Sequence, residues 1–116
     1  MASINFACKV FPIEKILRCA FGLSQTETEI LRYLVNTQEE VEVETISREI
    51  GKDKTTVQRN VKTLAEKGVI NRRQINLKQG GYVFVYSGKS KTFLKEKIYQ
   101  SFDNFKETLA KEIQRW

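Results

Sequence analysis

The polar residues best suited to chemistry lie in one short segment that begins at Lys54. At helical spacing, one side of this segment collects Lys54, Thr55, Gln58, Arg59 and Lys62. Arginine can bind guanine and glutamine can bind adenine through paired hydrogen bonds, threonine can meet a thymine methyl group, and lysine neutralises phosphate. The N-terminus of a helix adds backbone N–H donors. The pattern indicates a nucleic-acid-binding helix, and its alternative is an ordinary amphipathic helix with a solvated polar face.

Charge is clustered around the same segment. The chain has 116 residues and a formal net charge of +6. Residues 54–91 hold nine basic side chains and one acidic one, a net +8, whereas residues 25–49 hold two basic and seven acidic ones, a net −5. Solvated surfaces usually mix the two signs, so this clustering favours a nucleic-acid footprint.

The composition argues against most enzyme classes. The chain has no histidine, which removes Ser-His and Cys-His pairs and an imidazole base. Its two thiols, Cys8 and Cys19, are too few for a thiolate zinc site. Gly88-Lys89-Ser90 resembles the end of a phosphate-binding loop, but Val83 stands where the first glycine is needed. We therefore expect no enzymatic activity, no metal and no cofactor.

The cysteines admit two interpretations. Cys8 and Cys19 are eleven residues apart, so on one helix they would share a face. Buried, inert thiols are the commoner case, and a redox switch is the alternative.

The elements that must position the basic segment follow from spacing and caps. Apolar residues over 6–21 have helical spacing, with Pro12 where a helix can start and Gly22 as its stop. Ser24 and Glu27 form a capping box before a second helix. The expected buried face of that helix consists of Ile30, Leu31, Leu34 and Val35.

Further elements follow along the chain. Val41 and Val43 alternate with glutamates, which predicts a short strand. A short helix is expected over Thr45–Ile50, with Ile46 and Ile50 facing inward and Gly51 closing it. Asp53 is a good N-cap for the next helix. The inward stripe of that next helix is Val57, Val61 and Leu64. A glycine turn then joins two β-rich runs, Val69–Leu77 and Tyr82–Tyr86, into a hairpin.

The last segment, Lys91 to Trp116, predicts a long helix. Its apolar residues recur at steps of four, four and three, which makes a nearly straight stripe along the helix.

Three runs together resemble the winged helix-turn-helix of prokaryotic transcriptional regulators of the MarR and TrmB types. They are Ile46–Gly51, Asp53–Val57 and Leu64–Ile70, and the resemblance extends from about Leu23 to Tyr86. It implies an α+β, mostly α, fold with a β-hairpin wing and a long C-terminal dimerisation helix. It also implies three regions: an N-terminal helix that supports the dimer (1–22), the DNA-binding domain (23–88) and the dimerisation helix (89–116).

The resemblance assigns roles by position. Thr45–Ile50 would support a recognition helix, Lys54–Lys67, in the major groove, and the wing, Val69–Tyr86, would reach the backbone or minor groove. The DNA-binding residues would be Lys54, Thr55, Thr56, Gln58, Arg59, Lys62, Arg72, Arg73 and Lys78. Because side chains alternate along a strand, only one of Arg72 and Arg73 is expected to face DNA, and the alternative for one of them is pairing with the acidic segment.

The resemblance also implies that the terminal helices form a homodimer on an inverted-repeat site. The expected interface residues are Phe11, Leu17, Leu94, Ile98, Phe102, Phe105, Leu109, Ile113 and Trp116. The alternative is that the last helix packs on the N-terminal segment of its own chain.

The sequence thus favours a cytoplasmic, homodimeric, sequence-specific regulator of transcription that binds double-stranded DNA. Without an apolar run of membrane-spanning length, no membrane association is expected. Two alternatives remain: an architectural or chromatin-type DNA-binding protein with little sequence preference, and a winged-helix module that binds proteins. The residues indicate no particular small-molecule effector.

Overall fold

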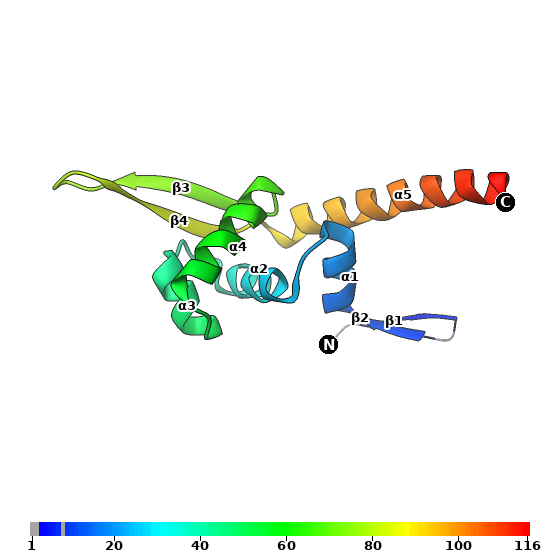
Figure 1. Ribbon diagram of the computed structural model, residues 1–116, viewed down its shortest axis with the longest axis horizontal. Coiled ribbons are helices and arrows are strands. Elements are labelled where there is room, and N and C mark those ends of the chain that lie inside the picture. The colour runs from blue at the N-terminus through cyan, green and yellow to red at the C-terminus, as the bar shows by residue number, and fades with distance from the viewer. Residues whose placement is uncertain (1–2, 8) are drawn as a thin grey trace. The chain divides into compact units, whose positions relative to one another are not determined.

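The computed structural model describes residues 3–7 and 9–116 and divides into two compact units (Figure 1). The central unit is Ser24–Ser90, and the terminal unit joins Met1–Leu23 to Lys91–Trp116. The central unit contains α2 (Gln25–Thr37), α3 (Val43–Ile50), α4 (Lys54–Glu66), β3 (Ile70–Asn76) and β4 (Tyr82–Gly88). The terminal unit contains β1 (Ser3–Phe6), β2 (Lys9–Pro12), α1 (Ile13–Phe21) and α5 (Lys91–Arg115).

Local side-chain hydrogen bonds and glycine conformations mark where the helices of the central unit begin and end. The predicted capping box of α2 is confirmed: the Ser24 hydroxyl accepts from the Glu27 amide at 3.1 Å, and Glu27 Oε1 accepts from the Ser24 amide at 2.8 Å. Asp53 caps α4, and Gly51 ends α3 with a φ of 72°, which favours glycine.

One buried core joins these elements. The predicted stripe of α4 is confirmed, because Val57, Val61 and Leu64 are fully buried. The main side chains from the other elements of the core are Ile30, Leu31, Leu34, Ile46, Val69, Ile70, Val85 and Tyr86. Val35 and Ile50, which were also expected to face inward, are half-buried.

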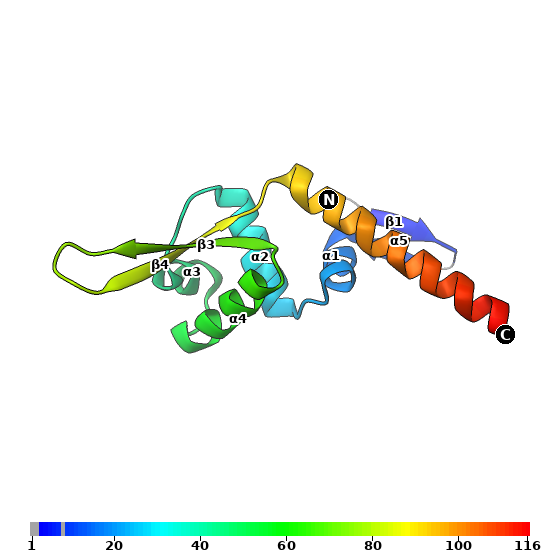
Figure 2. The ribbon, with the colours of Figure 1, turned by 90° about the horizontal axis from the view of Figure 1, so that it is seen from above.

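The wing is an antiparallel hairpin of β3 and β4, as predicted. Arg72 lies opposite Tyr86 in the register, and Arg73 lies opposite Val85. Both views show the turn of the hairpin projecting beyond the three helices of the central unit (Figures 1 and 2).

The strand predicted at Val41 and Val43 is wrong in part. Val41 makes a single antiparallel bridge to Tyr86, whereas Val43 is already the first residue of α3. Helical hydrogen bonding therefore takes over after one bridge, and α3 begins two residues before its predicted start.

Gly88 has a packing role at the end of β4. A Cβ atom at this position would lie 2.7 Å from the carbonyl oxygen of Leu34 in α2, which is closer than real contacts allow. The strand can approach the helix backbone only because this residue has no side chain.

The terminal unit begins with a hairpin that helical spacing did not predict. The α1 helix starts at Ile13, directly after Pro12 as expected, but β1 and β2 pair ahead of it, with Ile4 opposite Phe11. Proline fixes its own φ and lacks an N–H group, so it separates the strand from the helix. The predicted start of the helix near Pro12 is therefore confirmed, whereas the two strands ahead of it were not predicted.

The α5 helix is covered unevenly within the terminal unit. The Ser101 hydroxyl donates to the Ala20 carbonyl at 2.8 Å, which ties the first half of α5 to α1. Its second half extends past α1 (Figure 1) and leaves apolar side chains exposed. No helix within residues 3–7 and 9–116 combines the length and hydropathy needed to cross a membrane.

Candidate nucleic-acid interface

The α4 helix presents its predicted polar face to solvent. Lys54, Thr55, Gln58, Arg59 and Lys62 are all exposed. The buried stripe on the other side of the helix fixes its rotation about its own axis. The structure thus brings together five of the predicted site residues on one open surface.

Thr56, the remaining predicted site residue of α4, takes part in the helix cap. Its hydroxyl donates to Asp53 Oδ1 at 2.6 Å, and its amide donates to Oδ2 at 3.1 Å. These hydrogen bonds hold the pKa of the Asp53 carboxyl below its ordinary value. Thr56 is half-buried and builds the start of α4, so its hydroxyl is already used by the cap.

Lys54 lies beside an acidic residue of α3. Its Nζ is 3.2 Å from Glu44 Oε1, and both side chains are mostly exposed. An exposed ion pair of this kind is weak and is screened by salt. Lys54 therefore has a carboxylate partner that a phosphate group would have to replace.

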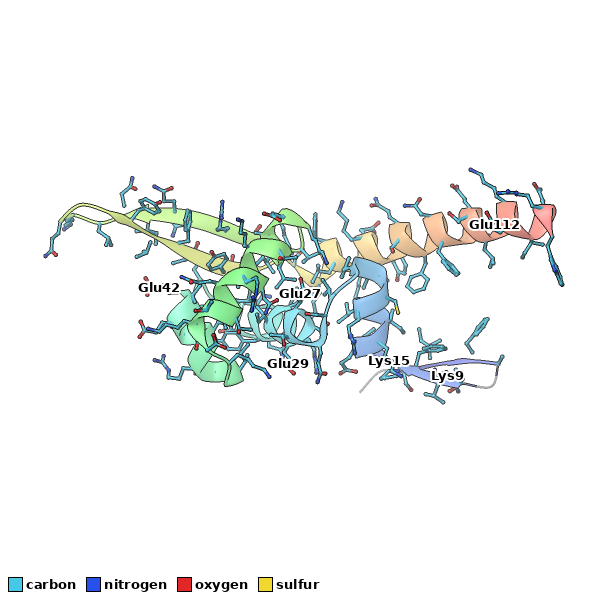
Figure 3. The ribbon with its side chains drawn as sticks, in the orientation of Figure 1. Lys9, Lys15, Glu27, Glu29, Glu42 and Glu112 are labelled. Carbon is cyan, nitrogen blue, oxygen red and sulfur yellow. The ribbon has the colours of Figure 1, made fainter. Side chains whose placement is uncertain are left out.

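A groove of about 370 Å³ lies between α4 and the wing. Lys54 and Gln58 of α4 line it together with Tyr82 and Phe84 of β4. Glu42, at the start of α3, lines it as well (Figure 3). The two aromatic residues were not predicted as site residues, although the alternation of side chains along β4 places them on one face of the strand.

The two adjacent arginines of the wing lie in different surroundings. The guanidinium carbon of Arg72 is 4.5 Å from the centre of the Phe84 ring, and Phe84 meets Tyr82 edge to face at 5.4 Å. Arg73 donates from Nε to Glu40 Oε2 at 2.8 Å and from Nη2 to Oε1 at 2.6 Å. The pairing with the acidic segment that was the alternative for one arginine is thus present at Arg73.

The forked Arg73–Glu40 pair also has an electrostatic consequence. The hydrogen bond to Arg73 lowers the pKa of Glu40, and the same contact raises the pKa of Arg73. Both groups are therefore charged at neutral pH. Lys78, the remaining predicted wing residue, is exposed in the turn, where the Leu77 amide donates to the Gly81 carbonyl at 3.0 Å.

The predicted dimer residues fall into three groups. Leu94 is buried within the chain, and Phe11, Leu17 and Ile98 are half-buried. The others are exposed from the middle of α5 to the residue just after its end: Phe102, Phe105, Leu109, Ile113 and Trp116. Tyr99 of α5 and Ile4, Phe6 and Val10 of the unpredicted hairpin are exposed apolar residues of the same unit.

The remaining candidate groups do not form a site. Cys19 is exposed on α1, and Cys8 lies outside the described residues. The part of the chain that the structure describes contains no group of three or more acidic or thiol side chains arranged to hold a metal ion.

Comparison with known proteins agrees with this geometry. Residues 17–103 match the family model described as "Sugar-specific transcriptional regulator TrmB". The uncharacterized protein MJ1503 of Methanocaldococcus jannaschii is 26% identical over 103 residues, which cover 85% of this chain and 77% of that protein.

Solved structures share the fold. A structure named as a possible transcriptional regulator from Methanosarcina mazei Go1 has a TM-score of 0.89 and 33% identity, over 99% of this chain and 97% of its own. A mutant of MepR from S. aureus, bound to an oligodeoxyribonucleotide, has a TM-score of 0.52 and 17% identity, over 85% of this chain and 76% of its own. The family consists of transcriptional regulators rather than enzymes, and the solved structures confirm the predicted winged-helix fold. The chain belongs to the TrmB family of transcriptional regulators.

Proposed function

We propose that this protein is a homodimeric regulator that binds double-stranded DNA with sequence preference. The α4 helix enters the major groove, and the wing reaches the backbone or minor groove. Residues 23–88 form the DNA-binding domain, and residues 1–22 and 89–116 support the dimer. The regulator acts in the cytoplasm of a prokaryotic cell, on an inverted-repeat site.

One observation carries the DNA-binding part of the proposal. Val57, Val61 and Leu64 are fully buried, so the opposite face of α4, with Gln58 and Arg59, is held outward. Side chains that can form paired hydrogen bonds with base edges are thus presented on a fixed helix, which is what discrimination between base pairs requires. The DNA-bound MepR structure supports this placement through the shared fold.

The dimer part rests on the uneven covering of α5. Phe105 is 62% exposed, Ile113 is 57% exposed, and both belong to one apolar stripe. Apolar stripes on helices are normally buried against another element. A second copy of the same stripe, related by a two-fold axis, would cover it and would place two α4 helices on successive turns of DNA.

The decisive experiment selects bound duplexes from a random pool and then measures affinity for the selected sequence by fluorescence anisotropy. We expect one inverted-repeat sequence to emerge and its affinity to fall steeply with salt, because several phosphate contacts release counterions. Uniform recovery of all sequences would favour an architectural protein. Absence of duplex binding at low salt would leave only the protein-interaction module.

Base contacts are tested by Arg59→Ala and Gln58→Ala. Each should weaken binding to the selected site by about 1–3 kcal/mol while leaving binding to random duplex nearly unchanged. Arg18→Ala is the matched control for Arg59→Ala, because Arg18 is an exposed arginine on α1 in the other unit. Equal losses on selected and random DNA would argue against base contacts from α4.

The dimer is tested by sedimentation equilibrium of Leu109→Gln and of its control Lys106→Gln. Both residues are exposed on α5, but only Leu109 belongs to the apolar stripe. We expect Leu109→Gln to shift the mass toward the monomer and Lys106→Gln to leave it dimeric. A wild-type chain that is monomeric at high concentration would overturn the dimer.

A further inference from the structure

The two adjacent arginines of the wing have the same side chain but different partners, which indicates that they have different roles. We infer that Arg72 is the arginine through which the wing contacts DNA, whereas Glu40 holds Arg73 as a structural clamp that does not contact DNA. This inference rests on the proposed DNA-binding function and deepens it.

The clamp follows from the strand register. Val41 is bridged to Tyr86, so Glu40, one residue earlier, projects to the opposite face of the sheet. That is the face of Val85 and of its cross-strand partner Arg73. The guanidinium of Arg73 therefore reaches across β4 and meets both carboxylate oxygens of Glu40, at 2.8 and 2.6 Å.

The ion pair with Glu40 already neutralises the charge of Arg73, so a phosphate contact by Arg73 would add little to the free energy of binding. If Arg73 moved to DNA, it would exchange one anion for another and would leave Glu40 unpaired near a polyanion. No additional charge would be neutralised, and the exchange would add little to the counterion release that drives binding. The forked geometry also gives the carboxylate both of its hydrogen bonds at once, which a single phosphate contact would have to replace.

Arg72 lies in the opposite situation. Its face of the hairpin is that of Phe84 and Tyr82, which line the groove beside Lys54 and Gln58 of α4. Among the described residues, no carboxylate pairs with Arg72, which instead stacks on Phe84 at 4.5 Å.

The stack prepares Arg72 for a contact. A guanidinium stacked on a ring keeps its N–H donors free in its own plane, and the ring restricts the side chain before DNA arrives. Less conformational entropy is then lost on binding. Arg72 thus offers an uncompensated charge on the side of the wing that α4 shares.

The test uses two double substitutions that both preserve the net charge of the chain. The first variant, Glu40→Gln with Arg73→Gln, removes the clamp. The second variant, Glu39→Gln with Arg72→Gln, removes the stacked arginine together with Glu39, an exposed glutamate adjacent to Glu40 in the sequence. Affinity for the selected duplex is measured by fluorescence anisotropy over a series of salt concentrations, and far-ultraviolet circular dichroism checks that both proteins are folded.

We expect the Glu40/Arg73 variant to bind within about twofold of the wild type with an unchanged salt slope. The Glu39/Arg72 variant should lose about tenfold in affinity, and its salt slope should become shallower by about one. If the Glu40/Arg73 variant lost affinity and slope as much as the Glu39/Arg72 variant, the assignment would be overturned.

A second measurement needs no DNA and separates the clamp from the proposed function. The carboxyl carbon of Glu40 is followed by NMR during acid titration. Arg73→Gln should return the pKa of Glu40 toward its ordinary value, and Arg72→Gln should leave it lowered. If the pKa of Glu40 were the same in Arg73→Gln and in Arg72→Gln, the clamp would be overturned. If the wild type bound no duplex, the proposed function and the role of Arg72 would be overturned instead.

Discussion

The central and terminal units bury their apolar residues to different extents. In the central unit, Ile30, Ile46 and Leu64 are fully buried within one chain. In the terminal unit, Phe105 and Leu109 are exposed along α5. One unit is therefore complete as a folded core, whereas the other has an apolar stripe still to cover. A protein that must hold a recognition helix rigidly and also associate would separate these two tasks in this way.

The comparison is tested most strongly by equal truncations in the two units. Leu64→Ala should lower the free energy of unfolding by about 3 kcal/mol, because it leaves a cavity in a closed core. Leu109→Ala should leave the unfolding of the dilute chain nearly unchanged, since its side chain is 46% exposed.

Urea denaturation at two protein concentrations distinguishes the two effects. At high concentration, Leu109→Ala should lower the unfolding midpoint, because association stabilises the folded chain by mass action. If Leu109→Ala and Leu64→Ala lowered the free energy of unfolding of the dilute chain equally, the contrast between the two units would be refuted.

The close approach of β4 and α2 is the next test of the closed core. Gly88→Ala should lower the free energy of unfolding by about 2 kcal/mol, because the new methyl group would meet the backbone of Leu34 and force the strand away. Ser87→Ala, at the neighbouring position of β4, should cost much less. Thermal unfolding of the two variants would sharpen the comparison, and an unaffected Gly88→Ala protein would argue against tight packing here.

The cap of α2 gives a smaller effect within the same unit. Ser24→Ala removes the acceptor for the Glu27 amide and should destabilise the protein by about 1 kcal/mol. The control Gln25→Ala changes the next, exposed residue without touching the cap. Denaturant titration checks both, and equal stabilities of the two variants would contradict a stabilising capping box.

The smallest expected effect is the change in stability caused by acid. The pKa of Asp53 is lowered by its hydrogen bonds to Thr56, so its contribution to stability is fully present at neutral pH and is lost as the pH falls below about 4. Asp53→Asn keeps a capping acceptor but does not titrate. The wild type should therefore lose more stability on acidification than Asp53→Asn does, and parallel pH profiles would contradict this.

Local signals allowed much of the central unit to be predicted. Ser24 and Asp53 mark helix starts by their own hydrogen bonds, and the spacing of Val57, Val61 and Leu64 fixes which side of α4 is buried. These features depend on residues a few positions apart. The polar face of α4 followed directly from them.

Other features depend on residues far apart in sequence and were not predictable in the same way. Glu40 and Arg73 are separated by 33 positions, and only the bridge from Val41 to Tyr86 brings their faces together. The hairpin of β1 and β2 was hidden because Val10 and Phe11 also fit a helical spacing with the residues of α1. Where the same apolar residues fit both a helix and a strand, the pairing of the two strands decides which of the two forms.

The two units also differ in the number of chain segments that form them. The central unit is one continuous stretch, Ser24–Ser90, whereas the terminal unit needs segments from both sides of it. During synthesis, the central unit can fold as soon as its own residues have left the ribosome, but α1 must wait for residues 91–116. The order of synthesis thus allows the unit that carries α4 to fold before α5 and its exposed apolar stripe have been made.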